Sequence, residues 1–502
     1  MQTSNPSEKS LKEAFAARNT WQTNRSSAIF PVRLRARSDL VIAYLNYWAL
    51  KNRIEDVLRV FRLYDSSGYV VGRQTAKVEG AGASVSIRKS FELQDGFDGM
   101  LEVEFISLAN LRFPFPAVQA FYTAGNALST VHSAGRNKNP DEAQSAYEPS
   151  LETNWICKFS TGITPFFHVF TSGTPSLPVT LEASVMRPDG TVLVSQTMQS
   201  LIRSPFGSRL VALDELFPQL WDGNPPPEGS YCRVSVPQLG LFPRLVVGNL
   251  HRATDLLEVT HSFAEQNSAD FVVKPLEVEL ASFIPALKPE ELNLSLHSFP
   301  TNTPSVIKAN LRVQPIGSAK LETRSEPIEW RSGGSNSHLM HYRLKDTDSL
   351  ISLDLRGNQI PSRLNVSYQF SVRGACAPYS TDIATGAKSC VYPPKHSHWG
   401  TGAVGGGFRM VLMARNMSHT PTSTQNSKGT LKLYFENGDT ETRVVEIDAE
   451  ASAFWYVGVS EKSGQDEDVA FVHWLANFDR GSIEMFWVSF AGDGRICGDH
   501  AF

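Results

Sequence analysis

Two closely spaced histidines near residue 400 form the most site-like stretch of the chain. His396 and His398 stand two positions apart, and residues at i and i+2 of a strand face the same side. Two imidazoles on one face can share a divalent metal, and Asp499 with His500 can complete the ligand set. The alternative is a partly buried aromatic loop, since no acidic residue lies within the loop itself. A divalent metal is therefore the one cofactor that the sequence suggests.

A second pair of histidines comes from an internal repeat. Phe113–Ser133 and Phe242–Phe263 both contain Phe-Pro, then seventeen residues, then His-Ser, which places His132 and His261 at equivalent positions. Each histidine is expected at the end of a strand, where it can bond loop carbonyls and fix the exit turn. The alternative is a symmetric pair of ligand-binding sites. His251 has no histidine counterpart in the first copy, so a site that needs it would exist only in the second copy.

Basic and aromatic residues supply two further candidate surfaces. Arg33, Arg35 and Arg37 alternate with apolar residues, which predicts one arginine-lined strand face. Such a face is either a solvated edge or a strip that binds sulfate, phosphate or an acidic sugar. Near the end of the chain, Trp487 is a candidate platform for stacking a sugar ring, although core packing is the alternative for most aromatic residues there.

The common catalytic signatures are missing from the sequence. G-x-S-x-G, the P-loop and H-E-x-x-H do not occur. Gly400-x-Gly402-x-x-Gly405 matches the dinucleotide fingerprint by letters, but it lacks a preceding strand and a following helix, so we reject a nucleotide site. A glycosidase with two carboxylates stays open, because such residues meet only in the folded chain.

Strand signals dominate the elements that must position these residues. Short apolar runs alternate with turns such as Asp65-Ser66-Ser67-Gly68 and Asn437-Gly438, at about ten-residue spacing. The sequence therefore predicts an all-β protein of tandem antiparallel β-sandwich modules with a short helical N-terminal extension. Its predicted parts are a tail at 1–28 and four modules at 29–136, 151–265, 270–395 and 396–502, the third being a diverged copy.

Composition limits the classes of partner. The 502 residues carry a net charge of −4, so no general cationic field is present to hold nucleic acid or an anionic membrane. No segment approaches the roughly twenty apolar residues needed to span a bilayer, and the N-terminus lacks an export signal. We therefore expect a cytoplasmic protein with reduced thiols, although Cys376 and Cys390 could form a disulfide in an oxidising compartment.

Repeated modules without a catalytic motif favour multivalent binding. The first hypothesis is a non-catalytic binding or scaffold protein that recognises a glycan or another protein. The alternative is a carbohydrate-active enzyme with a metal- or carboxylate-based site in the C-terminal modules. A structural component of a larger assembly is the third hypothesis, and exposed strand edges and oligomer formation would accompany it.

Overall fold

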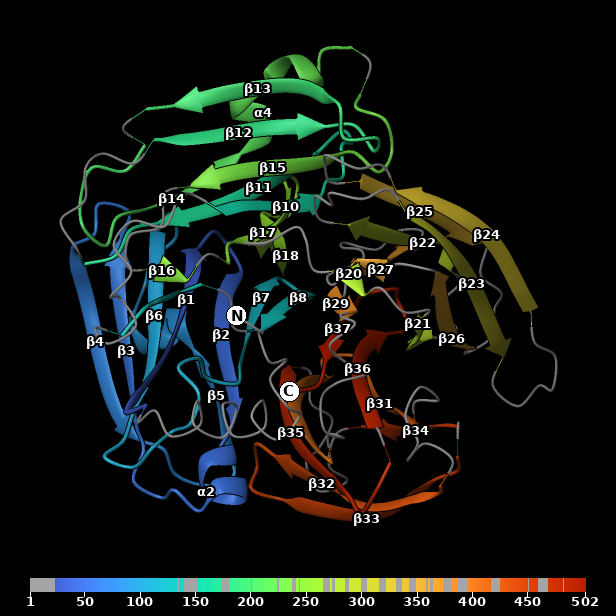
Figure 1. The fold of residues 1–502 in the computed structure, drawn as a ribbon. Helices are drawn as coiled ribbons and strands as arrows, with labels where there is room; N and C mark the ends of the chain where they lie inside the picture. The colour runs from blue at the N-terminus through green and yellow to red at the C-terminus, as the bar shows by residue number, and fades with distance from the viewer. Residues whose placement is uncertain are drawn as a thin grey trace, which may run out of the picture.

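The computed structural model is built almost entirely from antiparallel strands (Figure 1). At some positions, mainly between 271 and 385, only the backbone is described. The described residues are 23–132, 135–139, 151–173, 180–199, 201–223, 225–236, 241–242, 244–264, 271–272, 276–284, 289–298, 305–315, 322–330, 336–342, 349–357, 360–361, 364–372, 382–385, 396–416, 425–449, 451–458, 468–481 and 483–502.

The first module contains two four-stranded sheets, ordered β1-β6-β3-β4 and β5-β2-β7-β8. Two short helices, α2 (Tyr47–Asn52) and α3 (Ile87–Ser90), follow strands of the second sheet. The strands are β1 (Arg25–Arg33), β2 (Ser38–Leu45), β3 (Leu58–Asp65), β4 (Val70–Lys77), β5 (Gly82–Ser86), β6 (Asp98–Ile106), β7 (Val118–Ala124) and β8 (Ala127–His132).

The second module repeats this arrangement, with sheets β13-β12-β15-β10-β19 and β14-β11-β17-β18. Its strands are β10 (Leu151–Ile156), β11 (Ile163–Phe170), β12 (Leu181–Met186), β13 (Val192–Met198), β14 (Ser208–Ala212), β15 (Tyr231–Val236), β17 (Val246–His251), β18 (Leu256–His261) and β19 (Phe263–Ala264). Between β14 and β15 lie α4 (Leu213–Leu216) and the 3-10 helix η1 (Pro218–Leu220). A two-stranded pair, β9 (Arg136–Asn137) with β16 (Leu241–Phe242), joins the first two modules.

The third module has sheets β21-β26-β23-β24 and β25-β22-β28-β29. A short pair, β20 (Phe271–Val272) with β27 (Ile360–Pro361), accompanies them. The strands are β21 (Leu276–Ile284), β22 (Pro289–Ser298), β23 (Ser305–Pro315), β24 (Glu322–Trp330), β25 (Asn336–Tyr342), β26 (Ser349–Gly357), β28 (Leu364–Val372) and β29 (Asp382–Thr385).

The fourth module forms one continuous sheet, ordered β33-β32-β35-β30-β31-β36-β37, with β34 paired to β31. Its two halves join through the pair of Gly405 with Phe408. The strands are β30 (Ser397–Gly405), β31 (Phe408–Asn416), β32 (Ser427–Phe435), β33 (Thr440–Ile447), β34 (Ser452–Val457), β35 (Val469–Phe478), β36 (Ile483–Ala491) and β37 (Ile496–His500).

All four sets of eight strands share one topology. If the strands of each module are numbered one to eight along the chain, with the short strand β19 of the second module left out, the sheets read 1-6-3-4 and 5-2-7-8 in every case. The fourth module follows the same order once its sheet is opened at the β30–β31 turn. The predicted all-β class of tandem antiparallel sandwiches is therefore confirmed.

The exact limits of the modules stay a prediction. The first strand begins at Arg25, inside the segment that was expected to be a tail. The predicted N-terminal helix lies outside the described residues, as do Cys376, Cys390 and most of residues 137–150, which separate the first two predicted modules.

The modules share apolar cores across their boundaries. One buried cluster includes Val131 of β8, Leu257 of β18 and Leu475 of β35, which belong to three different modules. The eighth strand of the first module, β8, packs against the eighth strands β18 and β37 of the second and fourth modules. These strands lie toward the middle of the molecule (Figure 1). The strand ends that carry His132, His261 and His500 are thereby brought to one junction.

Glycines permit close packing where the fourth module meets the first. A Cβ on Gly400 would lie 2.9 Å from the Trp474 ring, and one on Gly402 would lie 2.1 Å from the sulfur of Met410. Between them, the Thr401 amide donates to the Gln119 side chain of β7 at 2.6 Å. The glycines of the rejected nucleotide motif thus stand in β30, a buried strand at the boundary with the first module.

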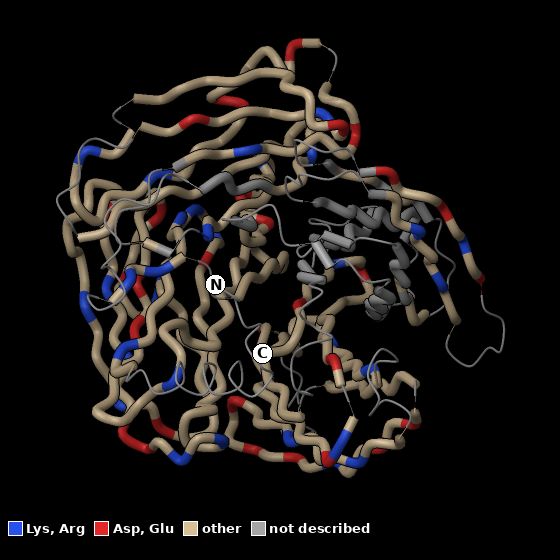
Figure 2. Tube along the Cα trace, in the orientation of Figure 1, with Lys and Arg blue, Asp and Glu red and all other residues tan. Residues whose placement is uncertain are grey.

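Charged residues of both signs are interspersed over the described strands (Figure 2). Among the described residues, no helix has the length and apolar character needed to cross a membrane.

Candidate functional site

Three histidines occupy the same place in three modules. His132 ends β8, His261 ends β18 and His500 ends β37, and each of these is the eighth strand of its module. Each pairs with the opening part of the seventh strand, where His132 lies opposite Gln119 and His261 opposite Val246. Because the eighth strands pack together, their ends bring the three imidazoles close to one another.

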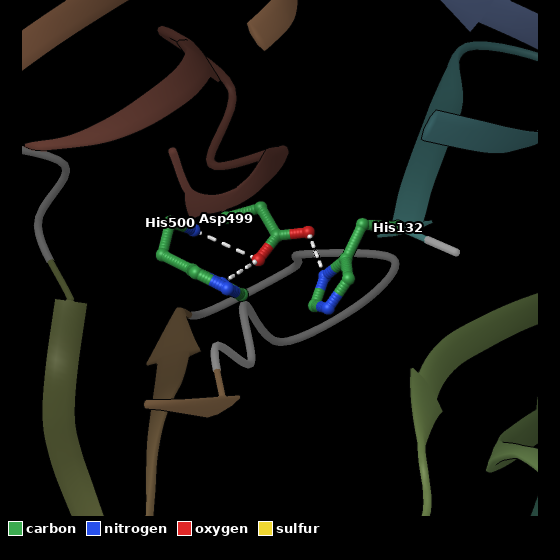
Figure 3. A group of neighbouring side chains, drawn as sticks. All are labelled: His132, Asp499 and His500. Atoms are coloured by element: carbon green, nitrogen blue, oxygen red, sulfur yellow. Dashed lines mark hydrogen bonds and ion pairs between the residues drawn. The ribbon is translucent and has the colours of Figure 1, made fainter. Parts of the chain in front are cut away.

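Asp499 joins two of these histidines (Figure 3). One carboxylate oxygen, Oδ2, lies 2.8 Å from Nδ1 of His132, while Oδ1 lies 2.8 Å from Nδ1 of His500. The backbone N–H of His500 also donates to Oδ1 at 2.8 Å, which orients the carboxylate. The contact between His132 and Asp499 ties the first module directly to the fourth.

His261 extends the chain of contacts into the second module. Its Nε2 lies 3.0 Å from Nε2 of His132, with the two rings nearly perpendicular at 84°. Its Nδ1 lies 3.2 Å from the carbonyl oxygen of Ser262. A backbone carbonyl, two imidazoles and a carboxylate therefore form one connected series.

The four side chains differ in their access to solvent. The side chains of His132 and Asp499 are 10% and 7% exposed and His261 is 3% exposed as a whole residue, whereas the His500 side chain is 36% exposed. Burial lowers the pKa of His132 below its ordinary value, against the opposing effect of Asp499. Burial also holds the pKa of His261 well below the usual range, and the Arg244 charge adds to this.

Asp499 stays ionised in this environment. Burial alone would raise the pKa of its carboxyl, but the charges and hydrogen bonds of His132 and His500 hold that pKa well below the usual range. A buried carboxylate with two imidazole nitrogens is a donor set that suits Zn²⁺ and similar divalent ions. One ligand atom from each of His132, Asp499 and His500 lies within 4.8 Å of the others.

The predicted metal set of His396, His398, Asp499 and His500 is only partly brought together. Asp499 and His500 are neighbours, but among the described residues the ligand group is completed by His132. His396 precedes β30 and is exposed, whereas His398 is fully buried with its ring 6.3 Å from that of Phe478. His396 therefore lies just before the opening strand of the module and His398 within it, and neither belongs to the group around Asp499.

The expected arginine strip on one strand face is wrong. The strand ends at Arg33, Arg35 lies in the following turn, and Arg37 has a left-handed backbone with φ 63°. The guanidinium groups of Arg33 and Arg35 both contact Asp98, at 3.4 and 2.6 Å. Asp98 thus already contacts the pair that was predicted to bind an anion and offsets one of its two positive charges.

His251 lies apart from the central junction. It stands at the opposite end of the β17–β18 pair from His261, facing Leu256. Its Nε2 contacts Oε2 of Glu258 at 2.9 Å, and both side chains are buried. This pair accounts for His251 without a ligand.

Trp487 is fully buried, which corrects its assignment as a sugar-stacking surface. Its exposure is 0%, and its ring centroid lies 6.0 Å from that of Phe121 in the first module. The neighbouring Phe486 is 3% exposed, so both faces of β36 are covered at this point. Trp487 packs at the boundary of two modules and offers no open face to a sugar.

A second buried polar cluster was missed from the sequence. Glu102 and Glu104 stand two residues apart on β6, each 1% exposed, and Arg25 and Arg62 contact both of them. The Asn137 amide donates to Glu102 at 2.7 Å. The sequence signal for this cluster was a pair of acidic residues alternating with apolar residues in a predicted strand. The sequence could not show that the segment around Asn137 would cover them.

Comparisons with known proteins do not place the chain in a family. No family model matches it, and no curated protein matches it. Among solved structures, Bacteroides uniformis β-glucuronidase 2 shares 11% identity over 51% of this chain and 28% of that one, with a TM-score of 0.13. Escherichia coli α-2-macroglobulin shares 8% identity over 92% of this chain and 30% of that one, with a TM-score of 0.13.

A tetra-tandem repeat from the extending region of a large adhesion protein shares 11% identity over 95% of this chain and 97% of that one, with a TM-score of 0.11. The chain spans less than a third of the glucuronidase and macroglobulin chains. At these TM-scores the likenesses carry no argument about function, which has to be inferred from the structure itself.

Proposed function

We propose that this protein is a non-catalytic scaffold that binds an extended segment of a protein partner along a free strand edge, principally β13. The observation that carries the proposal is a contrast among four equivalent edges. The eighth strands pack toward the middle of the molecule, whereas the fourth strand of each module stands at the end of its sheet. Among the described strands, β4, β13, β24 and β33 each pair on one side only.

Three of these edges carry the residues that normally prevent edge-to-edge pairing. Charged side chains and proline on an edge strand oppose the addition of another strand. Such residues are Arg73 and Lys77 in β4, Pro327 with four charged residues in β24, and Glu441, Arg443 and Glu446 in β33. By contrast, β13 reads VLVSQTM and contains neither a charge nor a proline. It is uncharged along its whole length in Figure 2.

The edges of the first two modules correspond residue by residue. Both fourth strands follow a turn with a positive-φ glycine, and both pairings shift register after the first pair, at Leu63/Tyr64 and Val185/Met186. Beyond this shift, Arg73 pairs with the third strand of the first module, and Ser195 pairs at the same position with the third strand of the second module. Ser195 therefore occupies the place of an arginine that protects the other edge.

The exposed side chains of β13 suit a polypeptide strand. Val192 is 53% exposed, and Ser195, Gln196 and Thr197 are also exposed. A partner strand would gain main-chain hydrogen bonds from the free edge, with its alternate side chains facing this uncharged surface. A glycan would instead favour an open aromatic ring, but β13 carries none, and the tryptophan predicted for that role is buried.

The proposal is tested by selecting peptides from a random displayed library on the wild-type protein, with Ser195→Arg as the discriminating variant. We expect enriched peptides with alternating apolar residues to bind the wild type and to bind Ser195→Arg at least about tenfold more weakly. Hydrogen exchange should show new protection of β13 amides when such a peptide is bound. The matched control is Arg73→Ser, which should create a second binding edge on β4.

Three results would overturn the proposal. The first is equal binding of the selected peptides to the wild type and to Ser195→Arg. The second is protection from exchange that falls outside β13, and the third is no enrichment of peptides at all.

A further inference from the structure

We infer that His132, Asp499 and His500 bind a divalent transition-metal ion, and that His261 sets the tautomer of His132 that makes this possible. The proposal goes beyond strand-edge binding, because it concerns the opposite side of each module. It also assigns different roles to histidines that the repeat places at equivalent positions.

The series of hydrogen bonds begins at a backbone carbonyl. The oxygen of Ser262 accepts, so its 3.2 Å contact is a hydrogen bond in the tautomer of His261 whose Nδ1 carries the proton, and the proposal takes this tautomer. The Nε2 atom of a neutral His261 then carries a lone pair. Because Nε2 of His132 lies 3.0 Å from it, that nitrogen is the donor of the second bond.

This assignment leaves Nδ1 of His132 without a proton. Its lone pair points at Oδ2 of Asp499 from 2.8 Å, so two acceptors face each other at hydrogen-bond distance. A proton shared by the two atoms, or a divalent ion bound by both of them, satisfies such a contact. The second shell therefore prepares His132 as a metal ligand, because a ligating imidazole normally passes its other N–H to a fixed acceptor.

The neighbouring atoms favour a metal ion over a single shared proton. His500 brings a second Nδ1 to within 2.8 Å of the same carboxylate, so two nitrogens and one oxygen converge. All three ligand atoms lie within 4.8 Å of one another. Tetrahedral metal–ligand bonds of about 2.0 to 2.2 Å place neighbouring ligand atoms about 3.3 to 3.6 Å apart, so both imidazole rings would move slightly away from the carboxylate when the ion binds.

Solvent reaches the site from one side. The His500 side chain is 36% exposed, whereas those of His132 and Asp499 are 10% and 7% exposed. An ion would enter beside His500 and keep a water there as its fourth ligand, since three protein ligands leave one tetrahedral position open. The ion would hold β8 to β37, and hence the first module to the fourth.

The experiment is a titration of the metal-stripped full chain with Co²⁺, followed by visible absorption and by competition with Zn²⁺. We expect one equivalent to bind with the intense absorption of a tetrahedral site. His500→Ala should lose this absorption, and it alters a partly exposed side chain, so folding should survive. His261→Gln should weaken binding about 10- to 100-fold, because it perturbs the second shell and leaves all three ligands in place.

The matched control is His251→Gln, which changes a buried histidine paired with Glu258 outside the junction. It should bind Co²⁺ as the wild type does. The proposal is overturned if the wild type gives no tetrahedral absorption with excess Co²⁺, in which case a proton bridges His132 and Asp499. It is equally overturned if His500→Ala binds Co²⁺ with the wild-type stoichiometry and spectrum.

Discussion

The polar network on β6 and the central junction bury carboxylates in different ways. On β6, Glu102 and Glu104 are matched by the two guanidinium groups of Arg25 and Arg62, so the charges balance among residues of the chain. At the junction, Asp499 faces imidazoles that carry no obligatory charge. The first cluster is complete without a ligand, whereas the second is complete only when a cation is added.

The difference follows from where the residues come from. The β6 network draws its four charged residues from three adjacent strands of one sheet, β1, β6 and β3. The central junction draws on three modules. A cluster within one sheet is fixed by strand register, but a cluster between modules can remain one charge short and be completed by an ion.

The largest expected effect comes from unbalancing the β6 network. Glu102→Gln removes one of two buried carboxylates and leaves two guanidinium groups to share Glu104. We expect a loss of about 3–5 kcal/mol in the free energy of unfolding of the first module, because a buried ion pair is broken and one partly buried guanidinium charge is left uncompensated. Denaturant unfolding of the full chain measures this loss, which should be the same with and without a chelator.

The control for this substitution is Asp98→Asn. Asp98 also contacts two arginines, but its side chain is 43% exposed, so we expect a loss below about 1 kcal/mol. A comparable loss in both variants would show that burial is not what distinguishes the β6 network.

The second prediction concerns pH and a buried histidine at the boundary of the first and fourth modules. Burial lowers the pKa of His473 to about 4, and its Nδ1 contacts the Thr401 hydroxyl at 2.8 Å. Since the folded pKa lies below the unfolded value, the unfolded chain binds more protons as pH falls. The neutral His473 side chain therefore contributes about 3 kcal/mol to the free energy of unfolding above about pH 6.5. This contribution is lost as the pH falls from about 6.5 to 4.

Denaturant unfolding at pH 7 and at pH 4 measures this dependence. His473→Gln should remove the part of the pH dependence of the unfolding free energy that this histidine contributes. Glu102→Gln should retain that part. An equal change in unfolding free energy between pH 7 and pH 4 in the wild type and in His473→Gln would contradict the prediction.

The third prediction separates the two clusters by metal removal. A metal present at about 100 times its dissociation constant stabilises the folded state by about 2.7 kcal/mol, so a chelator should lower the melting temperature accordingly. The chelator effect should be additive with that of Glu102→Gln, because the clusters share no residue. His500→Ala should melt identically with and without chelator, and a chelator effect that persists in this variant would exclude the proposed site.

Much of the fold could be predicted from local patterns. Turns such as Asn437-Gly438 are formed by short-range conformational preference, and Gly438 adopts a φ of 87° as such a turn requires. The equivalence of His132 and His261 was also visible, because a repeat preserves spacing. These features depend on residues near one another in the sequence.

The contacts of the candidate site depend instead on packing between modules. Nothing in the spacing of His132 shows that the end of β37 lies beside it, and the apparent pairing of His396 with His398 was misleading for the same reason. Trp487 was misassigned because strand alternation indicates opposite faces, and both faces of β36 are covered. Which faces meet solvent is decided by how the modules pack.

The bond between His132 and Asp499 joins residues 367 positions apart, and this separation determines when it can form. During synthesis each sandwich can fold as its own eighth strand emerges, since domains generally fold as units. The contact between β8 and β37 cannot form until the last of these strands has left the ribosome. Capture of an ion at the junction would therefore be a late event in biogenesis, and would distinguish a fully assembled chain from one whose modules have folded but not yet closed on one another.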